Sequence, residues 1–164
     1  MVWKYRDQSF DVISSIHGII DITPDEIIVP VSFHDIHENL CCFHKNTGHI
    51  DICENDVQQG SLGDCWLLSA LATIVKKFPK DIEACVKYSS LQYEYSVLFL
   101  FGRYIIVDHL IPVVYRNGVI SRIIAPRISS QNEYWPIVLE KAIVKLFASE
   151  FCPEECRFVN INKR

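Results

Sequence analysis

The chain has 164 residues, of which 49% are hydrophobic and 22% are charged, and its formal net charge is -4. This composition is that of one globular domain, or of one compact half of a larger core. The charge excludes the electrostatic footprint of a protein that binds nucleic acid or an anionic membrane, and no apolar run is long enough to span a bilayer.

The sequence contains seven cysteines, which is an odd number. Residues 1–7 lack the apolar region of a secretory signal peptide. We therefore expect a cytoplasmic protein with reduced thiols.

Residues 1–45 carry the weakest signals in the chain. Short β-branched runs are interrupted by Gly18, Pro24 and Pro30, which predicts a few short strands or extended segments. We treat this part as an N-terminal extension of unclear structure.

A cluster of cysteines and histidines follows, within residues 41–53. These residue types bind zinc, but paired zinc ligands are usually spaced two to four residues apart in two knuckles. Here Cys41 and Cys42 are adjacent, and His44, His49 and Cys53 follow loosely. We favour ordinary thiols and surface histidines, and a small zinc protein stays open as a remote alternative.

The central feature of the sequence is a glycine-containing turn that leads into an apolar run. Gly60 and Gly63 precede Cys65, and the run after Cys65 continues until Phe78 and Pro79 end it. This predicts a helix that begins at Cys65, is apolar nearly all round and is therefore buried and central.

A thiol at the positive end of a helix is favoured as the thiolate. The side-chain amide of Gln59 lies on the other side of the turn, where it is able to point at the same place. A polarised cysteine with a nearby amide donor is half of a cysteine-hydrolase site. We expect Asp64 to act as the helix cap and Trp66 to pack behind the thiol.

The next segments change from helical to strand periodicity. Residues 81–87 predict a short helix. In residues 91–97 polar residues alternate with Leu91, Tyr93, Tyr95 and Val97, which predicts a half-buried strand with these four on the inner face. We expect turns at residues 101–103 and at Arg116-Asn117-Gly118, where Asn-Gly suits a tight hairpin.

A second helix is predicted near the end of the chain. Pro136 suits its first turn, and the pattern continues to about Phe147. Its polar residues Glu140, Lys141 and Lys145 occupy one narrow stripe, so we expect this helix to be mostly buried. The order of helix, strands and helix predicts an α+β fold.

Three stretches together resemble the calpains, which are calcium-dependent intracellular cysteine proteases with a papain-like core. They read QGSLGDCWLLSA (59–70), NEYWPIVLEKA (132–142) and, more weakly, VDHLIP (107–112). The resemblance covers about residues 48–150. It implies a papain-like half-core, in which a central helix carrying Cys65 packs with antiparallel strands and a second helix. Residues 46–164 would then be the Cys-bearing catalytic subdomain.

The resemblance also implies roles for single residues. Cys65 would be the nucleophile, and Gln59 and the backbone N–H of Cys65 would stabilise the oxyanion. Asp56 and Glu133 match the positions that bind calcium in the family, and carboxylates suit this ion. The alternative is that both are solvated or salt-bridged carboxylates.

The catalytic base is missing from the resemblance. The family places its His and Asn well downstream of the Cys. Here the only histidine after Cys65 is His109, where the family has Asp, and the chain ends at Arg164. We expect the 164-residue chain alone to be inactive.

Besides the remote zinc alternative, two functions therefore remain open. The first is a cysteine endopeptidase of protein substrates whose His- and Asn-bearing subdomain is absent from this chain; the partner that we expect is such a second subdomain or, for the alternative, a full calpain. The alternative is a non-catalytic calpain-like binding or regulatory module. Neither involves nucleic acid or a membrane span.

Overall fold

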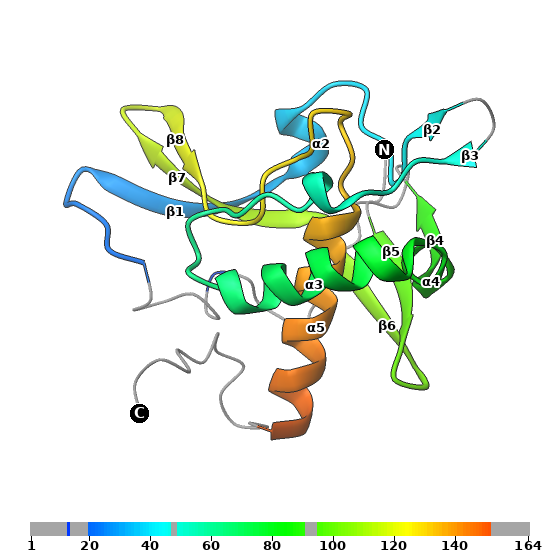
Figure 1. The fold of residues 1–164 in the computed structure, drawn as a ribbon. Coiled ribbons are helices and arrows are strands. Elements are labelled where there is room, and N and C mark those ends of the chain that lie inside the picture. Colours follow the sequence, from blue (N-terminus) through cyan, green and yellow to red (C-terminus); the bar gives the residue numbers. More distant parts are fainter. Residues whose placement is uncertain (1–12, 14–19, 47–48, 91–94, 152–164) are drawn as a thin grey trace.

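The computed structural model describes residues 13, 20–46, 49–90 and 95–151. Two three-stranded antiparallel sheets and a two-stranded one, formed by β2 and β3, surround two crossing helices, α3 (Cys65–Lys77) and α5 (Trp135–Phe151) (Figure 1). The predicted α+β class is confirmed. The strands are β1 (Glu26–Ser32), β2 (Lys45–Asn46), β3 (His49–Ile50), β4 (Val86–Ser90), β5 (Tyr95–Leu100), β6 (Arg103–Asp108), β7 (Leu110–Arg116) and β8 (Val119–Ile123). The helices are α2 (Phe33–Ile36), the 3-10 turn η1 (Glu54–Asp56), α3 (Cys65–Lys77), α4 (Pro79–Cys85) and α5 (Trp135–Phe151).

The first sheet has the strand order β1-β7-β8. β1 pairs with β7 along its whole length, from Glu26 opposite Arg116 to Ser32 opposite Leu110. β1 is one of the short strands expected before residue 45. The hairpin predicted between β7 and β8 is confirmed, because Asn117 and Gly118 both take the positive φ angles of a tight turn.

The second sheet has the order β4-β5-β6. The turn expected at residues 101–103 is confirmed by the positive φ angles of Phe101 and Gly102. The strand expected at residues 91–97 is present in β5, but the alternation does not decide its inner face, because the polar Ser96 is fully buried. The polar Ser96 is tolerated inside because its hydroxyl is hydrogen-bonded to His109. Residues 91–94 lie outside the described part of the chain.

α3 begins at Cys65 as predicted, but the prediction that it is buried all round is wrong. Only one face packs inward, through Leu67, Leu68, Leu71 and Val75. On the other face the side chains of Trp66 and Ile74 are 52% and 43% exposed. An apolar composition therefore did not imply burial, because nothing within the described chain covers the outer face of this helix.

α5 begins at Trp135, with Pro136 in its first turn as predicted, and it continues beyond Phe147. The helix is mostly buried, as expected, but its polar residues are not its exposed stripe: Glu140 and Lys141 are both inside. The Lys141 ammonium donates to the Asp108 carboxylate and to the backbone oxygen of Leu110. This buried ion pair fastens α5 to the junction of β6 and β7.

The short helix predicted at residues 81–87 is α4, which begins slightly earlier, at Pro79. Proline suits this position because its missing N–H is not needed in a first helical turn. Within the described residues, no helix combines the length and the apolar character that crossing a membrane requires.

Candidate active site

The loop before α3 is held against the segment that follows β8. The backbone N–H of Arg127 donates to the Gln58 carbonyl at 3.0 Å, and that of Ser61 donates to the Ile124 carbonyl at 3.0 Å. A Cβ atom on Gly60 would lie 2.5 Å from the Ile124 carbonyl oxygen and closer still to that of Ala125. Only glycine fits between these two backbones.

Gln59 lies between these anchored residues, and its side chain is exposed. Cys65 is the first residue of α3, and its thiol is free and exposed. The structure therefore presents an amide and a thiol to solvent from one loop-to-helix junction. The thiol lies where the unpaired N–H groups and the dipole of the helix favour negative charge.

Asp64 occupies the N-cap position of α3, as expected, but it caps the helix through its backbone and not through its side chain. Its backbone oxygen accepts from the N–H groups of Leu67 and Leu68, at 2.9 and 3.2 Å, whereas its carboxylate makes no capping hydrogen bond. The side chain is instead buried. Trp66, which we expected to pack behind the thiol, is more than half exposed.

The structure brings Asp56 and Glu133 together, although they are distant in sequence. Both are buried and their carboxyl groups are in hydrogen-bonding contact. Glu133 accepts from the backbone N–H of His44 at 2.7 Å and from the Ser129 hydroxyl at 3.1 Å. Asp56 accepts from the backbone N–H of Cys53 at 2.8 Å.

The electrostatics of this pair suit a cation. Burial, and then the negative charge of Asp56, raise the pKa of Glu133 to about 7. Within the described chain, no ion pair joins either carboxylate to a lysine or arginine. Among the described residues, no three His, Cys, Asp or Glu side chains are arranged so that they could hold a metal ion by themselves. Two carboxylates fit calcium if carbonyl oxygens or water complete its shell.

The cysteines at the start of the 41–53 cluster lie beside Glu133. Burial raises the pKa of the Cys41 thiol, and it raises that of Cys42 to about 12, in both cases with a contribution from the Glu133 charge. The Cys41 sulfur lies 3.8 Å from the Asn132 carbonyl oxygen. These surroundings disfavour the thiolates that a zinc site needs.

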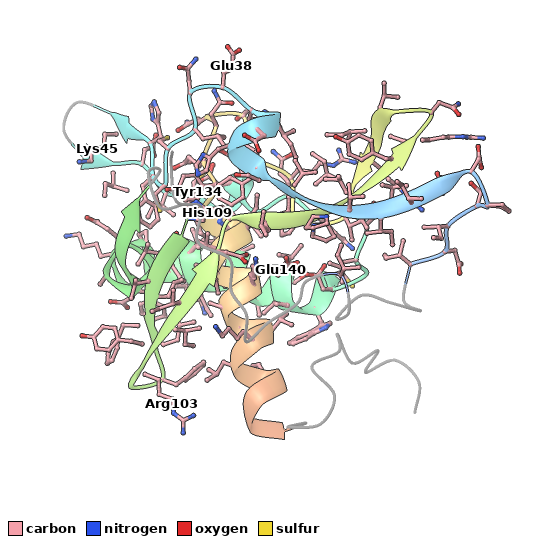
Figure 2. The ribbon with its side chains drawn as sticks, turned by 180° about the vertical axis from the view of Figure 1, so that it is seen from behind. Glu38, Lys45, Arg103, His109, Tyr134 and Glu140 are labelled. Carbon is pink, nitrogen blue, oxygen red and sulfur yellow. The ribbon has the colours of Figure 1, made fainter. Side chains whose placement is uncertain are left out.

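His109 is fully buried in the core. Its Nδ1 lies 2.8 Å from His34 Nε2, and its Nε2 lies 2.9 Å from the Ser96 hydroxyl. Burial, with smaller contributions from the positive charges of His34 and Lys141, lowers the pKa of His109 to about 3. Figure 2 shows His109 beside Tyr134, and their ring centroids are 5.3 Å apart. These are properties of a core residue and not of a base that reaches a substrate.

Sequence reasoning missed that Glu140 contacts Asp64, the residue before Cys65. Burial, and then a hydrogen bond to Asp64 and its charge, raise the pKa of Glu140 well above its ordinary value. One signal was available: Glu140 follows Ile137, Val138 and Leu139 in an apolar helix, where a solvated carboxylate has little room.

Comparison with known proteins gives consistent results. A family model described as calpain family cysteine protease matches residues 32–152. Calpain-13 of Rattus norvegicus is 35% identical over 101 residues, which are 57% of this chain and 14% of that protein. Calpain-A of Drosophila melanogaster is 32% identical over 133 residues, 77% of this chain and 15% of that protein. Calpain-12 of Homo sapiens is 36% identical over 107 residues, 60% of this chain and 14% of that protein. The chain thus spans about a seventh of the length of these relatives.

Proposed function

Because the chain belongs to the calpain family of cysteine proteases, we propose that it carries the nucleophile-bearing half of a cysteine endopeptidase site. Cys65 is the nucleophile in this proposal. The observation that carries it is the exposed thiol at the first residue of α3. A loop that only Gly60 allows to pack so closely leads into this position.

The chemistry assigned to this half is the attack on the scissile peptide bond of a protein substrate. The Cys65 thiolate adds to the carbonyl carbon, and the Gln59 amide and the Cys65 backbone N–H stabilise the oxyanion. The leaving amine then needs a proton donor. His109 is unsuited to this role because it is sealed in the core. The His and Asn therefore come from a second subdomain.

Asp56 and Glu133 are proposed to hold a calcium ion. The support is the contact between two buried carboxyl groups without a described cationic partner. A calcium ion supplies the positive charge that this pair lacks. It would join the turn η1, which leads toward Gln59, to the segment before α5.

Alkylation mapped by mass spectrometry tests the nucleophile. In the 164-residue chain we expect iodoacetamide to modify Cys65 faster than Cys42, whose pKa of about 12 keeps it a thiol. We also expect no cleavage of casein. Equal modification of both cysteines would contradict the assignment of Cys65. Casein cleavage that Cys65→Ser abolishes would contradict the need for a second subdomain.

The second candidate function is a non-catalytic calpain-like module. It is favoured by one observation, which is that His109, the histidine that follows Cys65 in sequence, is buried and hydrogen-bonded on both ring nitrogens. In that case Cys65 is a remnant of a catalytic ancestor, and the family surface serves binding or regulation. Complementation with a second subdomain separates the two, as set out below.

A further inference from the structure

The Asp64 carboxyl group is buried although Asp64 directly precedes the exposed Cys65. Asp64 is only 7% exposed. Among the described residues, no amide, hydroxyl or cationic group donates a hydrogen bond to Asp64 Oδ1 or Oδ2. Buried polar atoms nearly always have a partner, because an unpaired one costs about 1–3 kcal/mol. We therefore expect the Asp64 carboxyl group to have a partner other than an amide, a hydroxyl or a cation.

Glu140 supplies that contact from α5. Its residue is 3% exposed, its Oε1 also lacks a donor among the described residues, and its carboxyl group is in hydrogen-bonding contact with that of Asp64. Figure 2 shows Glu140 in the interior of the fold. Two buried carboxyl groups in contact are not both ionised, so the pair shares one proton.

The position of each residue decides which one keeps the proton. Asp64 lies at the N-terminus of α3, where the helix dipole stabilises a negative charge. Glu140 lies inside α5 and has no such stabilisation. Of the other charged side chains that the structure describes on α5, Lys141 is paired with Asp108 of β6, and Lys145 donates to the Ile106 carbonyl. Asp64 is therefore the charge that faces Glu140.

We infer that Glu140 is a positioning residue for Cys65: as a neutral acid it donates a hydrogen bond to the Asp64 carboxylate and so holds the start of α3. The inference rests on the proposed role of Cys65 as nucleophile. The link is short, because the Asp64 backbone oxygen accepts from Leu67 and Leu68 in the first turn of the helix. A displaced Asp64 would displace the residue that carries the thiol.

Loss of the Glu140 proton breaks this hold. Two buried negative charges then repel each other, and Asp64 moves away from α5. Thiolate formation alone would make the rate of Cys65 alkylation rise with pH. Because Asp64 moves, we expect the rate at high pH to rise less than that, and we call this difference the shortfall. Gln at position 140 is a neutral donor that does not titrate, so it keeps the hydrogen bond at every pH.

The test compares Cys65 alkylation by iodoacetamide in the wild-type 164-residue chain, Glu140→Gln and Glu140→Ala, between about pH 5 and pH 10. We expect the shortfall at high pH to disappear in Glu140→Gln. We expect Glu140→Ala to lower the alkylation rate of Cys65 about tenfold, because a misplaced reactive group reacts more slowly. Alkylation of Cys85, at the end of α4, serves as the internal control, and at each pH its rate should be the same in the wild type and in both variants.

Three outcomes would overturn the inference. One is a Glu140→Gln profile that coincides with the wild-type profile over the whole pH range, whether or not the wild type shows a shortfall, and this readout holds even if Glu140→Ala fails to fold. Another is a Glu140→Ala variant that folds and reacts like the wild type. In both cases the proposed nucleophile survives, because Cys65 still reacts. A wild-type Cys65 that does not react would overturn the nucleophile and this inference together.

Discussion

His109 shows how much the fold changes the chemistry of a single residue. The core buries its ring completely and holds both nitrogens, one against His34 and the other against Ser96. A histidine with a pKa lowered from 6.5 to about 3 stays neutral where the unfolded chain already binds a proton. Its contribution to stability is therefore fully present above pH 6.5 and is lost as the pH falls toward about 3.

We predict that His109→Phe flattens this acid-side loss. The unfolding free energy of the wild type should fall between pH 6.5 and pH 3, the two pKa values that define the window. The variant should be less stable at neutral pH, by about 1–3 kcal/mol for the hydrogen-bonding groups left unpaired, but less dependent on pH. Urea titrations at several pH values measure both effects. His37→Gln, at the end of α2, is the control, and equal acid sensitivity of wild type and His109→Phe would contradict the prediction.

Asp56 and Glu133 carry a second prediction at this scale. Calcium should bind the 164-residue chain with a measurable heat and should raise its midpoint of thermal unfolding, because an ion that binds only the folded chain stabilises it. Glu133→Gln and Asp56→Asn should each abolish the heat. Glu38→Gln changes an exposed carboxylate and should leave it intact. No calcium heat from the wild type at about millimolar concentration would favour simple buried carboxylates.

At the scale of the element, the loop and the helix that carry the proposed site depend on neighbours distant in sequence. α3 contributes the position of the thiol, while the segment after β8 sets the path of the loop through its hydrogen bonds to Gln58 and Ser61. α5 supports the same junction from inside, through Glu140. A change in any of these contacts should alter the alkylation rate of Cys65 even though Cys65 itself is not substituted.

Gly60→Ala tests the element directly. The added methyl group would collide with backbone atoms of Ile124 and Ala125, and a backbone cannot move aside as the end of a flexible side chain can. We expect a loss of stability of about 1–3 kcal/mol or more, together with slower alkylation of Cys65. Ser61→Ala changes the exposed neighbour in the same loop and should have little effect. Chemical unfolding and alkylation rates decide, and wild-type values for Gly60→Ala would show that the loop tolerates the shift.

At the scale of the whole molecule, α3 presents an apolar face that the described residues leave partly exposed. Trp66, which follows the thiol-bearing Cys65, is 52% exposed on this face, and Ile74, further along the helix, is 43% exposed. The chain also spans about a seventh of the length of the calpains that it matches. Both observations support the proposal that the catalytic site is completed by a second subdomain that bears His and Asn.

We therefore predict that a His- and Asn-bearing calpain subdomain, added to this chain, restores cleavage of casein. A peptide epoxide inhibitor should label Cys65 faster in the mixture than in the chain alone, because the added base generates the thiolate. Cys65→Ser should abolish cleavage and labelling. If the two subdomains bind each other but the mixture neither cleaves casein nor labels Cys65 faster, the non-catalytic module is the better interpretation.

The local features of this protein were predictable because they depend on neighbouring residues. Glycine and asparagine in the turns, Pro136 in the first turn of α5 and the glycines before Cys65 act within a few positions, so both hairpins and the start of α3 were predicted correctly. The motifs around Cys65 and Glu133 were sufficient to identify the family.

What the tertiary structure alone decided is which side chains are buried and which of them meet. α3 was predicted to be buried because it is apolar, yet its outer face has no partner in the described chain. Ser96, Glu140 and Lys141 look like surface residues, yet each is buried because another element brings its partner. Burial of a polar group depends on long-range contacts, and a local pattern carries no information about them.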